Sequence, residues 1–325
     1  MIRRRVLVPT LALAPAAARA RPQAPGQPAR IGFLHPRLSA STEPLRLAAV
    51  REGLAEAARS NRPVEIVARA ADGSAERLRA YAGELAGARL DAIVAVGPPG
   101  VDAARDATRT TPIVAIDLET DPVAAGWVES LARPGGNVTG VFFDAADFAA
   151  KCLQILAEAV PRLSRVGVLW DPSTGGHQRA AAEPSAARVG IALDLRPAST
   201  LADVESAVRA LAAGGVGALL VLSSPLFGAN TEAIAALAGA ARLPAIMPFP
   251  DFARYGGLVA YGPDIQDLFR RAGAMARRVV DGARAGELPV ERPVRFDLVL
   301  NLRAARALGL DLPPLLLARA DEVVE

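Results

Sequence analysis

The segment Arg30-Ile31-Gly32-Phe33-Leu34 has the composition of a short buried β-strand, and its order of residue types returns at Arg165-Val166-Gly167-Val168-Leu169. Both copies read basic, apolar, glycine, apolar, leucine. A short and nearly continuous apolar run is typical of a strand that is buried on both faces of a parallel sheet. The repetition therefore predicts two similar units in tandem.

Each copy is followed by further apolar runs in nearly the same rhythm. They cover residues 64–67, 92–96 and 113–116 after the first copy, and residues 191–193, 218–222 and 245–247 after the second. The segments between them are rich in Ala, Leu, Glu and Arg, so the alternation predicts β-α-β units. We therefore predict an α/β fold of two doubly wound parallel-sheet lobes with a cleft between them.

Residues 1–20 have the pattern of a secretory signal peptide. Arg3-Arg4-Arg5 forms a basic region, residues 6–14 are mainly apolar, and Ala18-Arg19-Ala20 matches an A-x-A cleavage site. Residues 21–29 contain three prolines and a glycine and are expected to form a flexible linker. No cysteine lies near the cleavage site to carry a lipid anchor, so we expect a mature protein that is free in the periplasm.

The charge of the mature chain argues against a nucleic-acid partner. The sequence has 37 basic and 34 acidic residues, but the segment 1–20 contains four Arg and no acid, which leaves 33 against 34. Binding to nucleic acid would need a clustered basic face. We therefore expect no nucleic-acid partner.

The sequence contains no common catalytic or cofactor motif. The patterns G-x-S-x-G, H-E-x-x-H and G-x-x-x-x-G-K-[ST] are absent, and no G-x-G-x-x-G follows the first strand. The two histidines, His35 and His177, have no second His or Cys at the spacing of metal ligands, and the single Cys152 permits no intramolecular disulfide. We expect no catalytic residue, no metal and no cofactor.

The turns that follow the predicted strands are the candidate binding residues, because ligands of open α/β sheets bind outside the carboxyl ends of the strands. In the first lobe the candidates are His35, Pro36, Gly97, Pro98, Pro99 and Asp121. A carboxylate such as Asp121 could hold a ligand ammonium through a charge-assisted hydrogen bond. Glu119, in the same turn, is expected to be a solvated side chain.

In the second lobe the candidates are Asp171, Ser173, Ser223 and Phe249. Hydroxyl and carboxylate groups at the starts of helices are also common N-caps, so a capping role for Ser173 remains an alternative. An aromatic ring such as Phe249 could stack on a ligand, although a single ring at a strand end is often part of the core.

Two longer motifs resemble a known family. Residues 130–141 read Ser-Leu-Ala-Arg-Pro-Gly-Gly-Asn-Val-Thr-Gly-Val after Asp121-Pro122-Val123, and the tail from Leu288 to Val323 contains Phe296-Asp297-Leu298-Val299-Leu300-Asn301-Leu302. Together with Tyr261-Gly262-Pro263-Asp264, these motifs resemble the tryptophan/tyrosine-type ABC transporter substrate-binding proteins, which have the type I periplasmic binding fold. The resemblance runs from about residue 30 to the end of the chain.

The resemblance implies a first lobe of residues 31–140 plus 265–290 and a second lobe of residues 141–262 plus 291–325. It also implies a ligand held between the lobes near His35, Pro36, the turn at residues 97–99, and Asp121. The protein would be a monomer that captures a small organic solute and delivers it to an ABC permease in the inner membrane. It would not be an enzyme.

The identity of the ligand and the recipient remains open at this point. Members that bind aromatic amino acids carry a Glu and an Asn-Ser pair after the sixth strand and an Asp-Asn pair later in the second lobe. At these places this chain reads Asp171-Pro172-Ser173-Thr174-Gly175-Gly176 and Ser223-Ser224-Pro225. The solute could be an amino acid or another aromatic or carboxylate compound. An alternative function is solute sensing, in which the closed protein presents its ligand to a receptor or histidine kinase.

Overall fold

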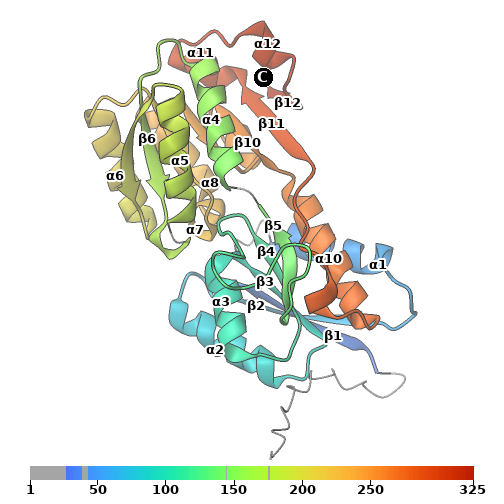
Figure 1. Ribbon diagram of the computed structural model, residues 1–325. Helices are drawn as coiled ribbons and strands as arrows, with labels where there is room; N and C mark the ends of the chain where they lie inside the picture. The colour runs from blue at the N-terminus through green and yellow to red at the C-terminus, as the bar shows by residue number, and fades with distance from the viewer. Residues whose placement is uncertain (1–26, 39–42, 144, 175) are drawn as a thin grey trace, which may run out of the picture.

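The computed structural model describes residues 27–38, 43–143, 145–174 and 176–325, and its strands form two separate sheets (Figure 1). The predicted signal peptide and residues 21–26 of the predicted linker lie outside the described residues. Ala29, the last residue assigned to that linker, is instead buried as the first residue of a strand. In the part of the chain that is described, no helix is both long and apolar enough to span a membrane.

The first sheet has five parallel strands in the order β2-β1-β3-β4-β5. They are β1 (Ala29–His35), β2 (Val64–Ala70), β3 (Ala92–Val96), β4 (Ile113–Asp117) and β5 (Val138–Phe142). The accompanying helices are α1 (Glu43–Glu56), α2 (Ala75–Gly87), α3 (Gly97–Ala107) and, from much later in the chain, α10 (Ile265–Val280), which packs against α1. We call this unit the first lobe.

The second sheet has seven strands in the order β12-β11-β10-β9-β8-β6-β7. They are β6 (Arg165–Trp170), β7 (Ala192–Pro197), β8 (Ala218–Val221), β9 (Ala245–Met247), β10 (Val259–Pro263), β11 (Phe296–Asn301) and β12 (Glu322–Val324). The helices of this unit, the second lobe, include α4 (Ala145–Ala159), α5 (His177–Arg188), α6 (Leu201–Ala213), α7 (Pro225–Ala229) and α8 (Thr231–Ala240). Shorter helical segments of this lobe are η1 (Pro172–Thr174), α9 (Asp251–Arg254), α11 (Leu302–Leu308) and α12 (Pro314–Leu317), whereas η2 (Ala285–Glu287) contacts β5 of the first lobe.

The glycine repeated in the two predicted strands has the same structural reason in each lobe. A Cβ on Gly32 would lie 2.7 Å from a methyl carbon of Leu90, and a Cβ on Gly167 would lie 2.8 Å from methyl carbons of Leu211 on α6. Both distances are far below van der Waals contact. Glycine in the strand therefore lets leucine side chains pack directly on the sheet.

One strand pair departs from the predicted parallel sheets. β10 and β11 are antiparallel, so the second sheet is mixed. β10 is parallel to β9 and its end leads directly into α10 of the first lobe, after which the chain returns through η2 to begin β11. Because the chain leaves and re-enters the second lobe at the same end of the sheet, these two strands must run in opposite directions.

The chain passes between the two lobes three times, between β5 and α4, between β10 and α10, and between η2 and β11 (Figure 1). The third passage is tied to the first sheet, since the N–H of Phe142 donates to the Glu291 carbonyl at 2.9 Å and the N–H of Glu291 donates to the Gly140 carbonyl at 2.9 Å. The residue boundaries predicted for the lobes stay a prediction.

Candidate ligand-binding site

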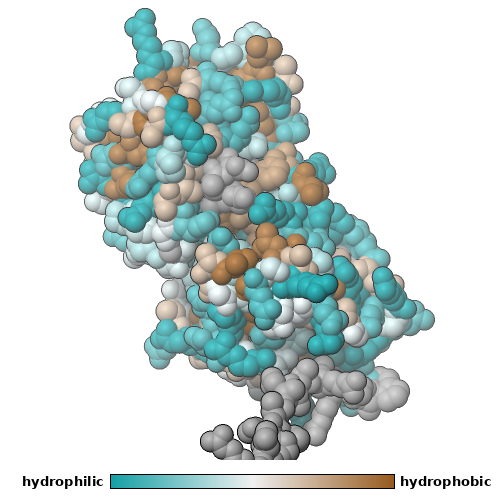
Figure 2. Space-filling model, viewed as in Figure 1, coloured by the Kyte–Doolittle hydropathy of each residue, from teal (hydrophilic) through white to brown (hydrophobic). Residues whose placement is uncertain are grey.

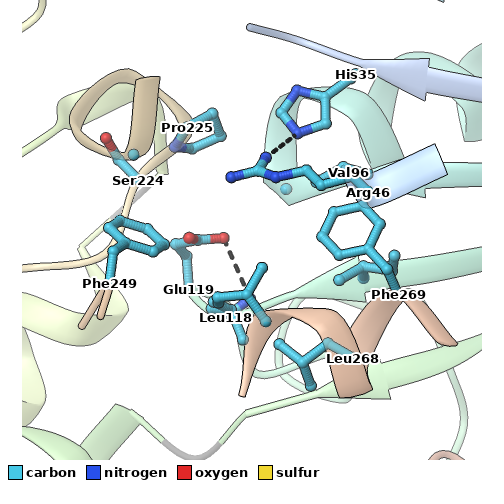
Figure 3. Close-up of a pocket in the computed structure, with 14 residues that line it drawn as sticks. His35, Arg46, Val96, Leu118, Glu119, Ser224, Pro225, Phe249, Leu268 and Phe269 are labelled. Carbon is cyan, nitrogen blue, oxygen red and sulfur yellow. Dashed lines mark hydrogen bonds between the residues drawn. The ribbon is translucent and has the colours of Figure 1, made fainter. Parts of the chain in front are cut away.

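A cavity of about 430 Å³, counting the part that is open to solvent, lies between the two lobes (Figure 3). Its walls are mainly apolar and include Val96, Ile116, Leu118, Phe249, Leu268 and Phe269. Its polar groups are His35, Arg46, Glu119 and Ser224, so the cavity combines a large apolar surface with one cation and one carboxyl group.

Three of the cavity residues lie at the carboxyl ends of strands, the region in which the sequence analysis placed its candidates. His35 is the last residue of β1, Glu119 lies two residues after β4, and Phe249 lies two residues after β9. Gly97 follows β3 directly, although the predicted turn at residues 97–100 is the first turn of α3. The space-filling view shows that the two lobes meet across a waist in the molecule (Figure 2).

The two lobes touch directly at the cavity. The Ser223 hydroxyl of the second lobe donates to Glu119 Oε1 of the first at 2.6 Å. A Cβ on Gly97 would lie only 2.9 Å from Cγ of Pro225, which faces it from α7. Ser223 is itself fixed by Gln178, whose Oε1 accepts from the Ser223 N–H at 2.9 Å and whose Nε2 donates to the Ser223 carbonyl at 2.8 Å.

Glu119 is not the solvated side chain that the sequence suggested. It is buried, with 4% of its surface exposed, because Ser223 covers it from the opposite lobe and its Oε2 accepts from the Leu118 N–H at 3.2 Å. Burial, with a smaller contribution from the charge of Asp171, raises the pKa of Glu119 to about 7, against the lowering effect of these two hydrogen bonds. A carboxyl group tuned to this range and facing a cavity is a candidate binding group.

Asp121 has a local role in the structure. Its Oδ1 accepts from the N–H groups of Val123 at 2.9 Å and Ala124 at 3.2 Å, and Asp121 is not among the residues that line the cavity. This is the turn-capping geometry that Asp often adopts before proline. A contact between Asp121 and a ligand stays a prediction, and Glu119 is the nearby acid that faces the cavity.

The other predicted residues divide between the cavity wall and its surroundings. The cavity is lined by three of them, His35, Gly97 and Phe249. The residues that do not line it are Pro36, Pro98, Pro99, Asp171, Ser173 and Ser223. Asp171 is buried and accepts from the N–H of the exposed Ser173 at 2.9 Å, which shapes the turn after β6. Ser223 acts through its hydrogen bond to Glu119.

Arg46 is a cavity residue that no sequence pattern singled out. It lies in the first turn of α1 and reaches His35, with 2.8 Å between Arg46 Nη1 and His35 Nε2, and its guanidinium lies 5.3 Å from the ring centroid of Phe269 (Figure 3). Phe269 belongs to α10, which is far from α1 along the chain. Only the packing of α1 against α10 and β1 brings these three side chains together.

The buried carboxyl of Glu119 makes the stability of the protein depend on pH. Its pKa is about 7 in the folded chain and near the ordinary value of 4.5 in the unfolded chain. Between these values the folded state holds a proton that the unfolded state lacks, so this group lowers the free energy of unfolding as the pH rises. We expect Glu119→Gln, which cannot ionise, to become progressively more stable than the wild type from about pH 4.5 to about pH 7.

Chemical denaturation of both proteins at a series of pH values measures this difference, with Glu232→Gln at an exposed position of α8 as the control. A difference of one pKa unit between the folded and unfolded states corresponds to about 1.4 kcal/mol. Parallel pH profiles for the wild type and Glu119→Gln would contradict the expectation.

Comparison with known proteins agrees with this architecture. The family model for ABC transporter substrate binding proteins matches residues 41–324. A tyrosine-binding protein from Clostridioides difficile (strain R20291) is 27% identical over 226 residues, which are 68% of this chain and 64% of that protein. The match thus spans less than two thirds of that relative's length.

Two solved structures share the fold. An ABC domain in complex with L-Trp from Streptococcus pneumoniae gives a TM-score of 0.84 at 22% identity, covering 92% of this chain and 100% of that chain. The ligand-free, open structure of a substrate binding protein with adhesive properties from Clostridium difficile gives a TM-score of 0.63 at 24% identity, covering 91% and 99%. The predicted two-lobed type I periplasmic binding fold is confirmed.

The family consists of solute-binding proteins rather than enzymes, which agrees with a cavity that is lined from both lobes. The family model covers most of the chain, including every strand of both sheets except β1, and the returning helix α10. The chain therefore belongs to the ABC transporter substrate binding protein family.

Proposed function

We propose that this protein is the solute-binding component of an ABC importer and that it captures an amino acid with a large apolar side chain between its lobes. The observation that carries this proposal is the interlobe cavity, whose apolar walls surround a single buried carboxyl group, Glu119. An aromatic or long aliphatic side chain would fill the apolar part. The ligand ammonium would meet Glu119.

The ligand ammonium would also compensate the negative charge of the buried Glu119 carboxylate. This carboxyl interacts with two other buried acids. The charge of Asp171 raises the pKa of Glu119, and the charge of Glu119 raises the pKa of Asp117. A cation placed against Glu119 favours its charged form and replaces the lost hydration. A positively charged group is therefore the ligand feature that this side of the cavity favours.

The relatives support the same class of ligand. One is a tyrosine-binding protein, and another structure was solved in complex with L-Trp. The TM-score is higher against that complex than against the ligand-free, open structure, at similar identity and coverage. This difference is what a closed arrangement of the lobes would give.

Binding and release would follow from the movement of the lobes. A solute that contacts both lobes binds the closed form better than the open form and so shifts the population towards closure. The three chain passages between the lobes would act as the hinge. The closed form would dock on a membrane permease, which is a separate protein. Residues 1–20 would direct export, and the mature protein would work as a monomer in the periplasm.

A ligand screen on the mature protein tests this proposal. We expect L-tryptophan, L-tyrosine or L-phenylalanine to raise the melting temperature by roughly 5–10 °C at a hundredfold excess over Kd, because a ligand that binds only the native state stabilises it by about 2.7 kcal/mol. The best ligand should also reduce the radius of gyration in small-angle X-ray scattering. Binding of none of the amino acids, or binding without compaction, would contradict the proposal.

A further inference from the structure

Among the described residues, the guanidinium of Arg46 has no neutralising partner at the cavity. Its hydrogen bond there is to His35, and no carboxylate of the described chain lies within 4.0 Å. The charge of Asp251 in the second lobe influences Arg46, but the carboxylate of Asp251 is held by Arg254 at 2.8 Å. Burial lowers the pKa of Arg46 to about 10, which reflects the loss of hydration around this cation.

His35 holds this cation without reducing its charge. His35 is buried, with 1% of its surface exposed, and burial together with the charge of Arg46 keeps its pKa well below the ordinary value, so the ring is neutral. Arginine can only donate, so Nε2 of the ring accepts from Arg46. A carboxylate at position 35 would have cancelled the charge of Arg46, whereas a neutral ring fixes only its direction.

The surroundings of His35 do not satisfy both ring nitrogens. The N–H of Arg37 points at Nδ1 at 3.2 Å, while Arg46 Nη1 points at Nε2 at 2.8 Å. A neutral imidazole carries one N–H and has one acceptor nitrogen, so one of these two donors always faces another N–H.

Arg46 and Glu119 line the same cavity from different elements of the first lobe, the helix that follows β1 and the turn that follows β4 (Figure 3). The apolar side chains Leu118, Leu268 and Phe269 lie beside them. The cavity therefore presents a cation, a carboxyl group and an apolar wall as three separate features.

We infer that Arg46 is the anion subsite of the cavity, where it binds the carboxylate of the ligand, and that His35 is the residue that positions it. This inference rests on the proposed function for the location of the site, and it adds that a carboxylate is required of the ligand. The guanidinium fork suits a carboxylate because two parallel N–H groups can donate to its two oxygens. Amines without a carboxylate would bind poorly.

Matched ligand triplets test this inference. Each triplet has an amino acid, its amine without the carboxylate, and its carboxylate without the amine: L-tryptophan, tryptamine and indole-3-propionate; L-phenylalanine, phenethylamine and 3-phenylpropionate; L-norleucine, pentylamine and hexanoate. Affinities are measured by calorimetry for the wild type, Arg46→Gln, Arg46→Lys, His35→Ala and Asp251→Asn.

In the wild type, we expect the carboxylate-bearing compounds of a triplet to bind more tightly than the corresponding amine. Arg46→Gln should weaken those compounds roughly 10- to 100-fold and leave the amine within about twofold. Arg46→Lys should recover part of the loss. His35→Ala should reduce the preference for carboxylates by a smaller factor. If His35 had a merely structural role, the same substitution would weaken the binding of all three compounds equally. Asp251→Asn should leave the preference unchanged.

The remaining outcomes separate this inference from the proposed function. Equal weakening of amine and carboxylate by Arg46→Gln would overturn the inference, as would amines that bind the wild type as tightly as amino acids, or a panel in which no carboxylate binds. Arg46-dependent binding of the simple carboxylates without binding of any amino acid would support the inference and overturn the proposed amino-acid ligand.

Discussion

Replacing Glu119 by alanine is expected to weaken binding of the amino acid ligand by roughly 30- to 1000-fold. The variant loses a charge-assisted hydrogen bond to the ligand ammonium, worth about 1.5–3 kcal/mol, and the interlobe hydrogen bond from Ser223, worth about 0.5–1.5 kcal/mol. A loss of about 1.4 kcal/mol corresponds to a tenfold change in Kd. The second loss acts only in the closed form, so Glu119→Ala should also shift the ligand-free protein towards the open form.

Two comparison variants separate these contributions. Glu119→Gln keeps an oxygen that can accept from Ser223 and removes the negative charge, so it should lose affinity through the ammonium contact alone. Asp121→Ala removes a carboxylate two residues away that the structure places in a turn, and we expect it to change Kd less than threefold.

Calorimetric titration of all three variants with the best ligand from the screen measures these effects, with circular dichroism to check folding. If Asp121→Ala weakens binding as strongly as Glu119→Ala, the ammonium site has been assigned to the wrong carboxylate. If a folded Glu119→Ala binds like the wild type, Glu119 has no part in binding.

Replacing Gly53 by alanine is expected to destabilise the first lobe by about 3 kcal/mol. Gly53 lies on α1 where this helix crosses α10, and a Cβ there would lie 1.8 Å from the Arg270 carbonyl oxygen and 2.9 Å from the Ala274 nitrogen. Gly273 makes the reciprocal contact, since its Cβ would lie 2.2 Å from the Val50 carbonyl oxygen. The two helices can approach so closely only because both positions are glycine.

The site depends on this helix crossing. Arg46 comes from α1, and Leu268 and Phe269 come from α10, so displacement of the helices would separate the cation from part of the apolar wall. Gly53→Ala should therefore weaken ligand binding as well as lower the melting temperature.

Gly83→Ala is the matched control, because Gly83 is an exposed helical glycine of α2 whose Cβ would meet no atom within 4 Å. It should stabilise the protein by about 0.5–1 kcal/mol through helix propensity. Differential scanning calorimetry should show a decrease of roughly 6–12 °C for Gly53→Ala and a small increase for Gly83→Ala. Equal melting temperatures for the two variants would contradict this account of the crossing.

Eight strands could be predicted from the sequence because each is a short apolar run bounded by polar or turn-forming residues. β10 and β11 were not predicted as neighbours, because their pairing depends on the passage of the chain through α10 in the other lobe. A local apolar pattern marks a strand but contains no information about the direction in which the chain returns.

The candidate site was predicted as a set of loops at the carboxyl ends of the strands, and the structure places three of the predicted residues, His35, Gly97 and Phe249, in the cavity wall. Within the loop after β4, the sequence favoured Asp121 over Glu119 as the ligand contact. Asp before Pro marks a turn, and the sequence does not show whether the carboxylate of such a turn binds a ligand or only caps the turn. Burial by Ser223, which follows much later in the chain, distinguishes the two acids, and no local pattern reports it.

The sequence alone determined the α/β class, the two repeated units with a glycine in the first strand of each, and the family resemblance, because all of these depend on local periodicity or contiguous motifs. Only the tertiary structure decided which side chains share the cavity. Arg46, Glu119 and Phe269 come from elements that are distant in the chain, and their burial, their charges and their hydrogen bonds depend on the closure of one lobe on the other and on the packing of α10 against α1. Those interactions act across space, so residue spacing could not predict them.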